Sequence, residues 1–90
     1  MEFEWDEDKR QLVLSERKID FLDMVAVFDG RPSYSYESIR DDEPRHVTVA
    51  QLNGKLFAVI WTEREGRIRI ITARRARDVE ERTYHQHYDG

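Results

Sequence analysis

The dipeptide Asn53-Gly54 constrains the fold of this chain more than any other feature of the sequence. It stands between two strand-like runs, "HVTVAQL" at 46–52 and "KLFAVIW" at 55–61. An Asn-Gly pair in this setting is typical of a two-residue type I′ turn, because both residues adopt positive φ readily. The sequence therefore predicts a tight antiparallel hairpin in which residue 52 faces residue 55.

Further strands extend this hairpin into a sheet. The run 55–61 is apolar at both parities, which indicates a strand that is covered on both faces. Glu65-Gly66 predicts a second turn that leads into "RIRIIT" at 67–72. Two weaker segments alternate in the same way, one around Tyr34 and Tyr36 and a short edge strand at Phe3-Glu4-Trp5. A loop is expected at 40–44.

Capping residues mark three helices. Asp6 is suited to cap a helix over 8–17 with Leu12 and Val13 facing inward, and Asp20 is suited to cap a second one. The second helix carries an apolar face and ends before Gly30; that face is formed by Leu22, Met24, Val25, Val27 and Phe28.

The C-terminal helix is expected to start near Asp78, with Glu81 three residues later closing a capping box. Together the elements predict a single α+β domain over residues 1–90. It would have a small antiparallel sheet of three to four strands, two N-terminal helices and one C-terminal helix.

Charge is divided unevenly along the chain. Residues 1–44 hold 13 acidic and 6 basic residues, a net charge of −7, and residues 45–90 hold 6 and 9, a net charge of +3. The overall charge of −4 argues against a simple nucleic-acid coat protein, and the asymmetry predicts one anionic and one cationic face. There is no cysteine, no run long enough for a membrane span and no apolar leader, so a cytoplasmic protein is expected.

Six arginines lie between Arg64 and Arg77, with Glu65 as the single acidic residue among them. If both turns are two-residue loops, position 45 faces 62, position 62 faces 69 and position 60 faces 71. This register gathers positive charge at one end of one sheet face, formed by Arg45, Arg64, Arg67 and Arg69, with Arg74, Arg75 and Arg77 just past the strand. His46 would lie on the opposite face, beside Trp61.

Two interpretations of this cluster are open. Single arginines on a strand are usually solvated positions that keep an edge or face soluble. Clustered like charges repel, however, and the guanidinium group binds phosphate through two parallel hydrogen bonds. We therefore expect an anionic partner, which could be RNA, DNA or an acidic protein surface.

Nearly the whole chain resembles one family, the BrnT toxins of bacterial type II toxin–antitoxin systems. The blocks that carry the resemblance are "FEWDEDKR" at 3–10, "IDFLDMVAVFDG" at 19–30, "RHVTVAQLNGKLFAVIWTEREGRIRIITARRA" at 45–76 and "EERTY" at 80–84. The resemblance implies a fold similar to the RelE-like ribonuclease toxins and ribonuclease activity without a metal or other cofactor. It also implies a small BrnA-like antitoxin that forms a hetero-oligomer with the toxin and makes the DNA contacts; no membrane contact is expected.

The chain departs from the family pattern in one important place, with smaller departures at Thr72, where relatives usually carry serine, and at Ala50, where they usually carry glycine. Relatives usually carry a Lys-His-Gly triplet before the second helix, and this chain has Glu16-Arg17-Lys18 there. If that histidine carries protons in relatives, this chain lacks it, because arginine stays protonated.

RNA cleavage by its own 2′-hydroxyl needs a base, an acid and cations that stabilise the phosphate. The proton carriers considered are Glu63, Glu80, Glu81 and Tyr84. The residues predicted to act in catalysis are Arg64, Arg69, Arg74, Arg75, Glu81 and Tyr84. Those predicted to bind RNA are Arg17, Lys18, Arg45, Arg67 and Arg77, and no metal ligand is predicted.

The leading hypothesis is a metal-independent ribonuclease toxin. The first alternative is a binding module that keeps antitoxin or RNA binding but cleaves weakly or not at all. A third is a toxin that acts on a protein target.

Overall fold

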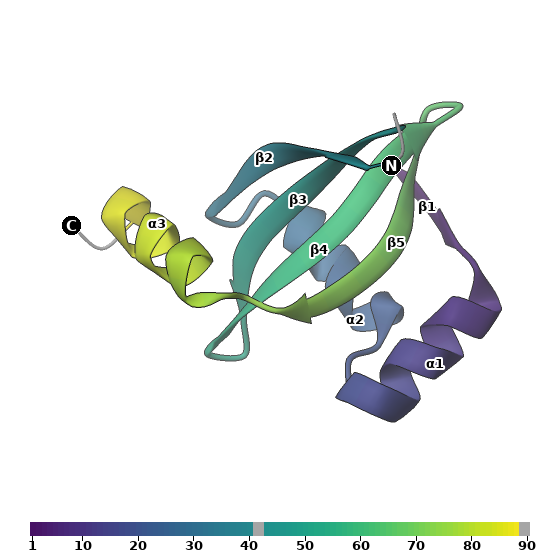
Figure 1. Ribbon diagram of the computed structural model, residues 1–90, viewed down its shortest axis with the longest axis horizontal. Helices are drawn as coiled ribbons and strands as arrows, with labels where there is room; N and C mark the ends of the chain where they lie inside the picture. Colours follow the sequence, from purple (N-terminus) through teal and green to yellow (C-terminus); the bar gives the residue numbers. More distant parts are fainter. Residues whose placement is uncertain (41–42, 89–90) are drawn as a thin grey trace.

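The computed structural model describes residues 1–40 and 43–88, and within these ranges five strands form one sheet (Figure 1). The strands are β1 (Glu2–Trp5), β2 (Ser33–Arg40), β3 (Glu43–Leu52), β4 (Lys55–Arg64) and β5 (Arg67–Arg75). Their order is β1-β5-β4-β3-β2, with β1 parallel to β5 and the other pairs antiparallel. The helical segments are α1 (Glu7–Arg17), α2 (Phe21–Met24), the 3₁₀ helix η1 (Val25–Phe28) and α3 (Asp78–Tyr88).

The predicted fold class was wrong in two respects. The described part of the chain forms a mixed sheet of five strands, not an antiparallel sheet of three to four, because Glu2–Trp5 pairs in parallel with β5. The second expected N-terminal helix is a four-residue α-helical turn that continues as η1. β-Branched Val25 and Val27 favour an α-helix only weakly, and 3₁₀ turns are common where a helix ends.

Both predicted N-terminal caps are confirmed. The carboxylate of Asp6 accepts hydrogen bonds from the N–H groups of Asp8 and Lys9 at 2.9 and 3.3 Å. The carboxylate of Asp20 accepts one from the N–H of Leu22 at 3.0 Å. The predicted inward faces were partly wrong, since Leu22 is 55% exposed and the side chain before it, Phe21, is fully buried. Leu12 is likewise exposed.

The two predicted hairpin turns are confirmed. Asn53 and Gly54 have φ of 52° and 79°, and Glu65 and Gly66 have φ of 55° and 78°. Positive φ at both central residues is the signature of a type I′ turn, which matches the right-handed twist of the flanking strands. The turns fix residue 52 opposite 55 and residue 64 opposite 67.

β5 departs from the predicted register at a β-bulge. The sequence predicted Ile60 opposite Ile71, but Ile60 faces Thr72, which leaves Ile71 as the extra residue. Because side chains alternate along a strand, one extra residue exchanges the two faces for the rest of the strand. Arg74 therefore lies on the face of Ile60, and Ala73 lies in the core on the opposite face.

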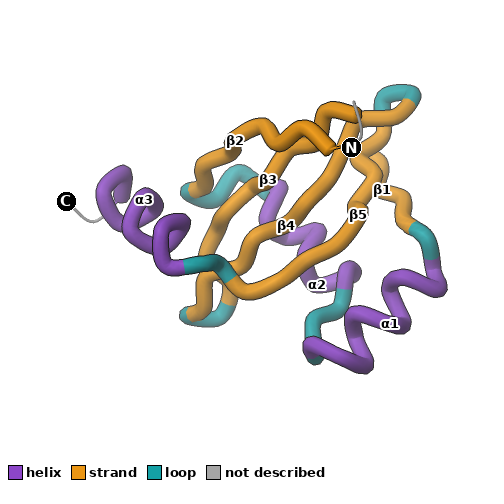
Figure 2. The backbone as a smooth tube through the Cα atoms, in the orientation of Figure 1, coloured by secondary structure: helices purple, strands orange, loops and turns teal. Residues whose placement is uncertain are grey.

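Apolar side chains pack on both faces of the sheet, as predicted for β4. The face under α1, α2 and η1 buries the larger core, formed by Val13, Ile19, Phe21, Met24, Val27, Ala50, Leu52, Val59, Ile68, Ile70 and Ala73. The other face packs a smaller cluster against α3, formed by Val47, Val49, Leu56, Ala58 and Tyr84. Figure 2 shows α3 beside one end of the sheet, on the far side from α1. A pocket occupies the neighbouring part of this second face.

Candidate active site

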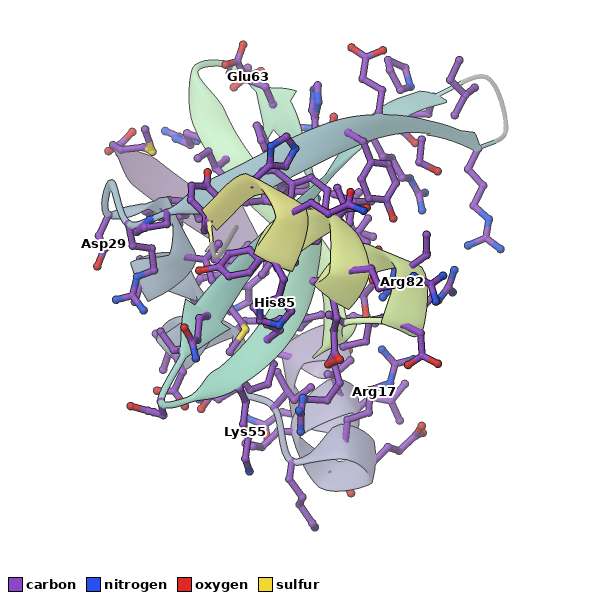
Figure 3. All side chains as sticks on the ribbon, turned by 90° about the vertical axis from the view of Figure 1, so that its left-hand side faces the viewer. Arg17, Asp29, Lys55, Glu63, Arg82 and His85 are labelled. Carbon is purple, nitrogen blue, oxygen red and sulfur yellow. The ribbon has the colours of Figure 1, made fainter. Side chains whose placement is uncertain are left out.

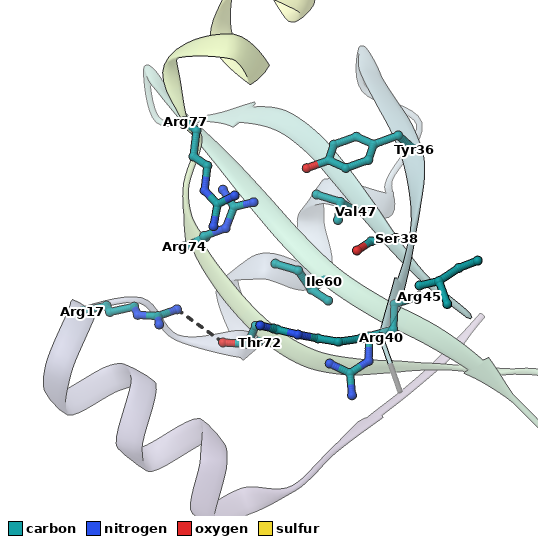
Figure 4. A pocket seen from close by; sticks show the side chains of 11 residues that line it. Arg17, Tyr36, Ser38, Arg40, Arg45, Val47, Ile60, Thr72, Arg74 and Arg77 are labelled. Atoms are coloured by element: carbon teal, nitrogen blue, oxygen red, sulfur yellow. Dashed lines mark hydrogen bonds between the residues drawn. The ribbon is translucent and has the colours of Figure 1, made fainter. Parts of the chain in front are cut away.

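A pocket of about 430 Å³ hollows the sheet face that carries α3 (Figure 4). Its floor is a row of side chains on four neighbouring strands: Tyr36, Val47, Ile60 and Thr72 face one another in the strand register. The complete lining is Arg17, Tyr36, Ser38, Ile39, Arg40, Arg45, Val47, Ile60, Thr72, Arg74 and Arg77. The pocket thus gathers residues from four strands, from the end of α1 and from the segment that leads into α3.

The pocket is strongly cationic. Five of its lining residues are arginines, and none of the described lining residues is acidic. Arginine side chains stay charged in proteins, and a concave site lined by one sign of charge focuses the electrostatic potential. The structure brings together four arginines predicted from the sequence with one that was not; the predicted ones are Arg17, Arg45, Arg74 and Arg77, and the added one is Arg40.

Arg17 enters the pocket from the last turn of α1. Its Nη1 donates a hydrogen bond to the carbonyl oxygen of Ala73 at 2.8 Å. The same atom donates to Oγ1 of Thr72 at 3.4 Å, the bond drawn in Figure 4. These two bonds anchor the guanidinium group of Arg17 to β5, so α1 contributes a fixed positive charge to the pocket.

A buried carboxylate, Glu80 of α3, holds another pocket arginine in place. Glu80 is 3% exposed, and its oxygens accept hydrogen bonds from Nη1 and Nη2 of Arg74 at 2.7 and 3.0 Å. The backbone N–H of Arg77 donates to the same carboxylate at 2.8 Å, and the hydroxyl of Tyr36 donates to it as well. A bidentate pair fixes the plane of the guanidinium group, so Arg74 faces the pocket in one orientation.

The protonation states in this network follow from its geometry. Burial alone would raise the pKa of Glu80, but the hydrogen bonds from Arg74, the Arg77 N–H and Tyr36 outweigh it and lower the pKa to about 2. The hydrogen bond to Glu80 raises the pKa of Arg74. Burial, together with its bond to Glu80, raises the pKa of Tyr36. Near neutral pH, Glu80 is therefore ionised, Arg74 is charged and Tyr36 keeps its proton.

Glu80 also takes the capping position that the sequence analysis gave to Glu81. α3 begins at Asp78, as predicted. The carboxylate that reaches back to the N–H of Arg77, the residue before the helix, is that of Glu80. This is the return bond of a capping box, in which an acid three residues after the cap accepts from the N–H of the cap residue. One side chain thus joins the helix start to the pocket.

Arg45 on β3 is only loosely paired within the described part of the chain. Its Nε atom is buried and makes no hydrogen bond to any described residue. Its Nη2 atom lies 3.8 Å from the carboxylate of Glu43, which is a loose ion pair. Arg45 lines the pocket and has only this loose ion pair among the described residues, so its guanidinium group is suited to pair with an anion there.

The arginines near the β4–β5 turn are not among the pocket lining residues. Arg67 and Arg69 share one sheet face, as predicted, because Ile68 between them is buried in the opposite core. Both are paired with β1, since Nε of Arg67 lies 3.2 Å from Glu2 and Nη1 of Arg69 lies 2.7 Å from Glu4. Each of these acids is 65 positions away from its arginine, so the local sequence pattern did not predict the ion pairs.

The remaining predicted site residues lie at separate places. Arg64 is exposed at the end of β4, and Arg75 lies over an aromatic ring of β4, 5.5 Å from its centroid. Lys18 forms the C-cap of α1 with a left-handed φ of 59°. Tyr84 of α3 is buried against the sheet, and Glu81 on the same helix is half-buried. Their functional roles stay predictions.

Other candidate proton carriers are also placed. Figure 3 shows Glu63 at the opposite side of the molecule from Arg17, near the end of the β4–β5 hairpin. His46 stacks on Trp61 with ring centroids 4.6 Å apart, so its predicted position beside Trp61 is confirmed. His87 on α3 lies 5.8 Å from the ring of a β2 tyrosine.

Tyr36 and Arg40 line the pocket but were not predicted as site residues. Both lie on β2, where residues of even number from 36 to 40 line the pocket, and Ser38 pairs directly with Arg45. If the alternating segment around Tyr36 had been paired with the next strand, the sequence would have placed Tyr36 and Arg40 beside Arg45. The predicted loop at 40–44 was wrong at its ends, which belong to β2 and β3, and residues 41–42 lie outside the described residues.

The groups that the pocket offers to a ligand are guanidinium groups and the hydroxyls of Ser38 and Thr72. Within residues 1–40 and 43–88, no group of three or more His, Asp or Glu side chains could hold a metal ion. Over the same ranges, no helix has the length and apolar character needed to cross a membrane.

The sequence profile of one protein family, described as "Ribonuclease toxin, BrnT, of type II toxin-antitoxin system", matches residues 5–80. A search of curated proteins found no match. The matched segment covers most of the 90 residues and contains every pocket residue, from Arg17 to Arg77, and the buried Glu80. A toxin of such a system has RNA as its target and a protein antitoxin as its partner. The chain therefore belongs to the BrnT family and is a ribonuclease toxin of a type II toxin–antitoxin system.

Proposed function

We propose that the protein is an endoribonuclease and that its arginine pocket holds the phosphate that is cut. The observation that supports this is the convergence of five arginines in one pocket of about 430 Å³. Planar guanidinium groups bind phosphate oxygens through paired, charge-assisted hydrogen bonds. Arg45 supports the same kind of ligand, because its ion pair with Glu43, at 3.8 Å, is a loose one.

The reaction we propose is attack of the neighbouring 2′-hydroxyl on the phosphorus. A P–O2′ bond forms and the P–O5′ bond breaks, which leaves a 2′,3′-cyclic phosphate and a 5′-hydroxyl. Negative charge increases on the phosphate oxygens in the transition state, and donors that are already oriented stabilise it without reorganising. Arg74, clamped by Glu80, is oriented in this way.

The reaction needs a base for the 2′-hydroxyl proton and an acid for the leaving 5′ oxygen. The hydroxyl of Tyr36 donates to Glu80, and the carboxylate of Glu80 is ionised and bonded to Arg74, so we give neither group a proton-transfer role. The predicted carriers Glu63, Glu81 and Tyr84 stay hypotheses, which alanine and phenylalanine variants test.

A second candidate function, RNA binding with weak cleavage, is favoured by one observation. Arg17 stands where the resemblance places a histidine, and it is bonded to the carbonyl oxygen of Ala73 in the pocket. An arginine there holds a phosphate but does not exchange a proton near neutral pH. The two candidate functions involve the same contacts with RNA and differ in the rate of cleavage.

We further propose that the antitoxin is BrnA-like, that it supplies the DNA contacts of the complex, and that the toxin acts in the cytoplasm. Co-expression with the neighbouring reading frame tests the pairing. A stable complex that suppresses RNA cleavage supports it, and a toxin that purifies alone and stays active beside that protein contradicts it.

The decisive experiment is RNA cleavage by the purified chain in excess EDTA, with products resolved for the 2′,3′-cyclic phosphate. We expect cleavage to persist, and Arg45→Ala to reduce kcat by about 10²–10³, the loss typical of one transition-state donor. Lys55→Ala is the matched control, because Lys55 is an exposed cation at the β3–β4 turn. Cleavage that needs added divalent metal, or equal rates for the two variants, would contradict the proposal.

A further inference from the structure

A second, smaller hollow adjoins the arginine pocket. It has a volume of about 390 Å³ and lies between β2 and the first turns of α3, lined by Tyr34, Tyr36, Val79, Glu80 and Thr83. Tyr36 lines both hollows. The two sites are therefore neighbours that share one aromatic side chain, and a single ligand that passes Tyr36 can occupy both.

The rings of this groove are held in fixed positions. Tyr34 and Tyr36 stack with centroids 6.3 Å apart and an interplanar angle of 27°. The Tyr34 hydroxyl donates to the backbone oxygen of Glu80 at 3.0 Å, and the Tyr36 hydroxyl donates to the carboxylate of the same residue. Because both hydroxyls are engaged, the groups left for a ligand are apolar ring surfaces, and a preorganised ring loses little entropy on binding.

One wall of the groove is an exposed valine. Val79, the second residue of α3, is 58% exposed, and Tyr36 opposite it is 39% exposed. A large apolar residue on a helix surface beside partly exposed aromatic rings makes a patch suited to a flat, apolar ligand surface. Among the described residues no cation lines this groove, in contrast to its neighbour with five arginines.

We propose that this groove is a nucleobase subsite, which takes the base next to the phosphate bound in the arginine pocket. The inference rests on the proposed function and deepens it. A nucleotide has an anionic phosphate and a flat aromatic base. The arginine pocket suits the phosphate, and the adjoining groove with its tyrosine rings suits the base. Every base has a π-face that can stack on tyrosine, so the subsite reads the presence of a base more than its identity.

The test uses a short 2′-fluoro oligoribonucleotide, which keeps phosphates and bases but has no 2′-hydroxyl to attack, and an abasic counterpart with the same number of phosphates. The wild-type chain should bind the base-carrying strand about 5- to 100-fold more tightly, the range expected for one stacked base. Val79→Ser should weaken binding of that strand by about 3- to 10-fold and leave the abasic strand unchanged. Leu22→Ser is the control, because Leu22 is 55% exposed on α2, across the sheet from the groove.

The two strands and the variants together distinguish failure of the base subsite from failure of the proposed function. Equal affinity for both strands, with both weakened by Arg45→Ala, would keep the phosphate pocket and overturn the base subsite. If Arg45→Ala leaves the affinity for both strands unchanged, the phosphate-pocket proposal is wrong, and the base subsite that rests on it is wrong as well. If Val79→Ser weakens the antitoxin complex but neither RNA probe, the groove is a protein contact and the inference is wrong. Melting temperatures of the variants confirm that each is folded.

Discussion

Replacing Glu80 by glutamine should cost the fold much of its stability near neutral pH. Three donors converge on this carboxylate: the guanidinium group of Arg74, the N–H of Arg77 and the hydroxyl of Tyr36. Glutamine keeps the size but removes the negative charge, and its amide NH₂ would face another donor. Breaking a buried ion pair on one side typically costs about 3–5 kcal/mol. Total stabilities of small domains are about 5–15 kcal/mol, so the variant should be clearly weakened.

The dependence of this loss on pH follows from the pKa of Glu80. The pKa is about 2 in the folded protein, against an ordinary value of 4.5. At 1.36 kcal/mol per pKa unit, this difference corresponds to about 3 kcal/mol of stability. Because the folded pKa is the lower one, that stability is present above pH 4.5 and is lost as the pH falls toward 2. The gap between wild type and Glu80→Gln should therefore shrink by about 3 kcal/mol over this range.

Urea unfolding followed by the fluorescence of Trp5 and Trp61 measures this gap at pH 7, 5, 4, 3 and 2. Asp20 and Asp29 also have lowered pKa values, through hydrogen bonds from Arg10 and Arg31, but they titrate in both proteins. The difference between the proteins thus isolates Glu80. A gap that stays constant from pH 7 to pH 2 would show that the carboxylate is not stabilised by its donors, and the clamp on Arg74 would lose its basis.

Three further predictions concern single side chains. Lys18→Gly should raise the free energy of unfolding by about 0.5–1 kcal/mol in urea titrations. Lys18 has a left-handed φ of 59°, and glycine relieves more backbone strain there than it adds in freedom of the unfolded chain. An unchanged or lower free energy of unfolding would count against strain at this cap. Arg17→His should raise the RNA cleavage rate, by up to about 10²–10⁴ if the imidazole carries a proton, with similar or slightly weaker affinity; slower cleavage would place the proton carriers elsewhere. The log of RNA affinity should fall linearly with log salt at about −0.7 per phosphate contacted, and Arg45→Ala should reduce that slope while Lys55→Ala does not; an affinity indifferent to salt would exclude an electrostatic site.

Local features of the fold could be predicted from the sequence because their causes lie within a few residues. Asn53-Gly54 fixed one hairpin register through its turn type, and Asp6 and Asp20 marked helix starts through their own hydrogen bonds. The start of α3 at Asp78 was predicted in the same way. Each of these signals is short-range, so one sequence is enough to read it.

The largest misses depend on contacts between distant segments. The parallel pairing of β1 with β5 brings Glu4 to Arg69, which is 65 positions away, and the local sequence pattern does not predict this pairing. That pairing brings acids to arginines that looked unneutralised in the sequence. Tyr36 and Arg40 entered the site because β2 pairs with β3, which places them beside Arg45.

The extra residue in β5 has a consequence for how relatives of this protein can be compared. Because Ile71 is inserted opposite a regular β4, Arg74 lies in the pocket, while Ala73 is buried under the helices. If the same residues paired without this bulge, Ile71 would face Ile60, and the strand would turn Ala73 toward the pocket and Arg74 toward the core. A relative with one residue fewer here would form a regular strand and still keep its arginine on the pocket face. An alignment with such a relative needs a one-residue gap at Ile71, because an ungapped alignment would compare residues from opposite faces of the sheet.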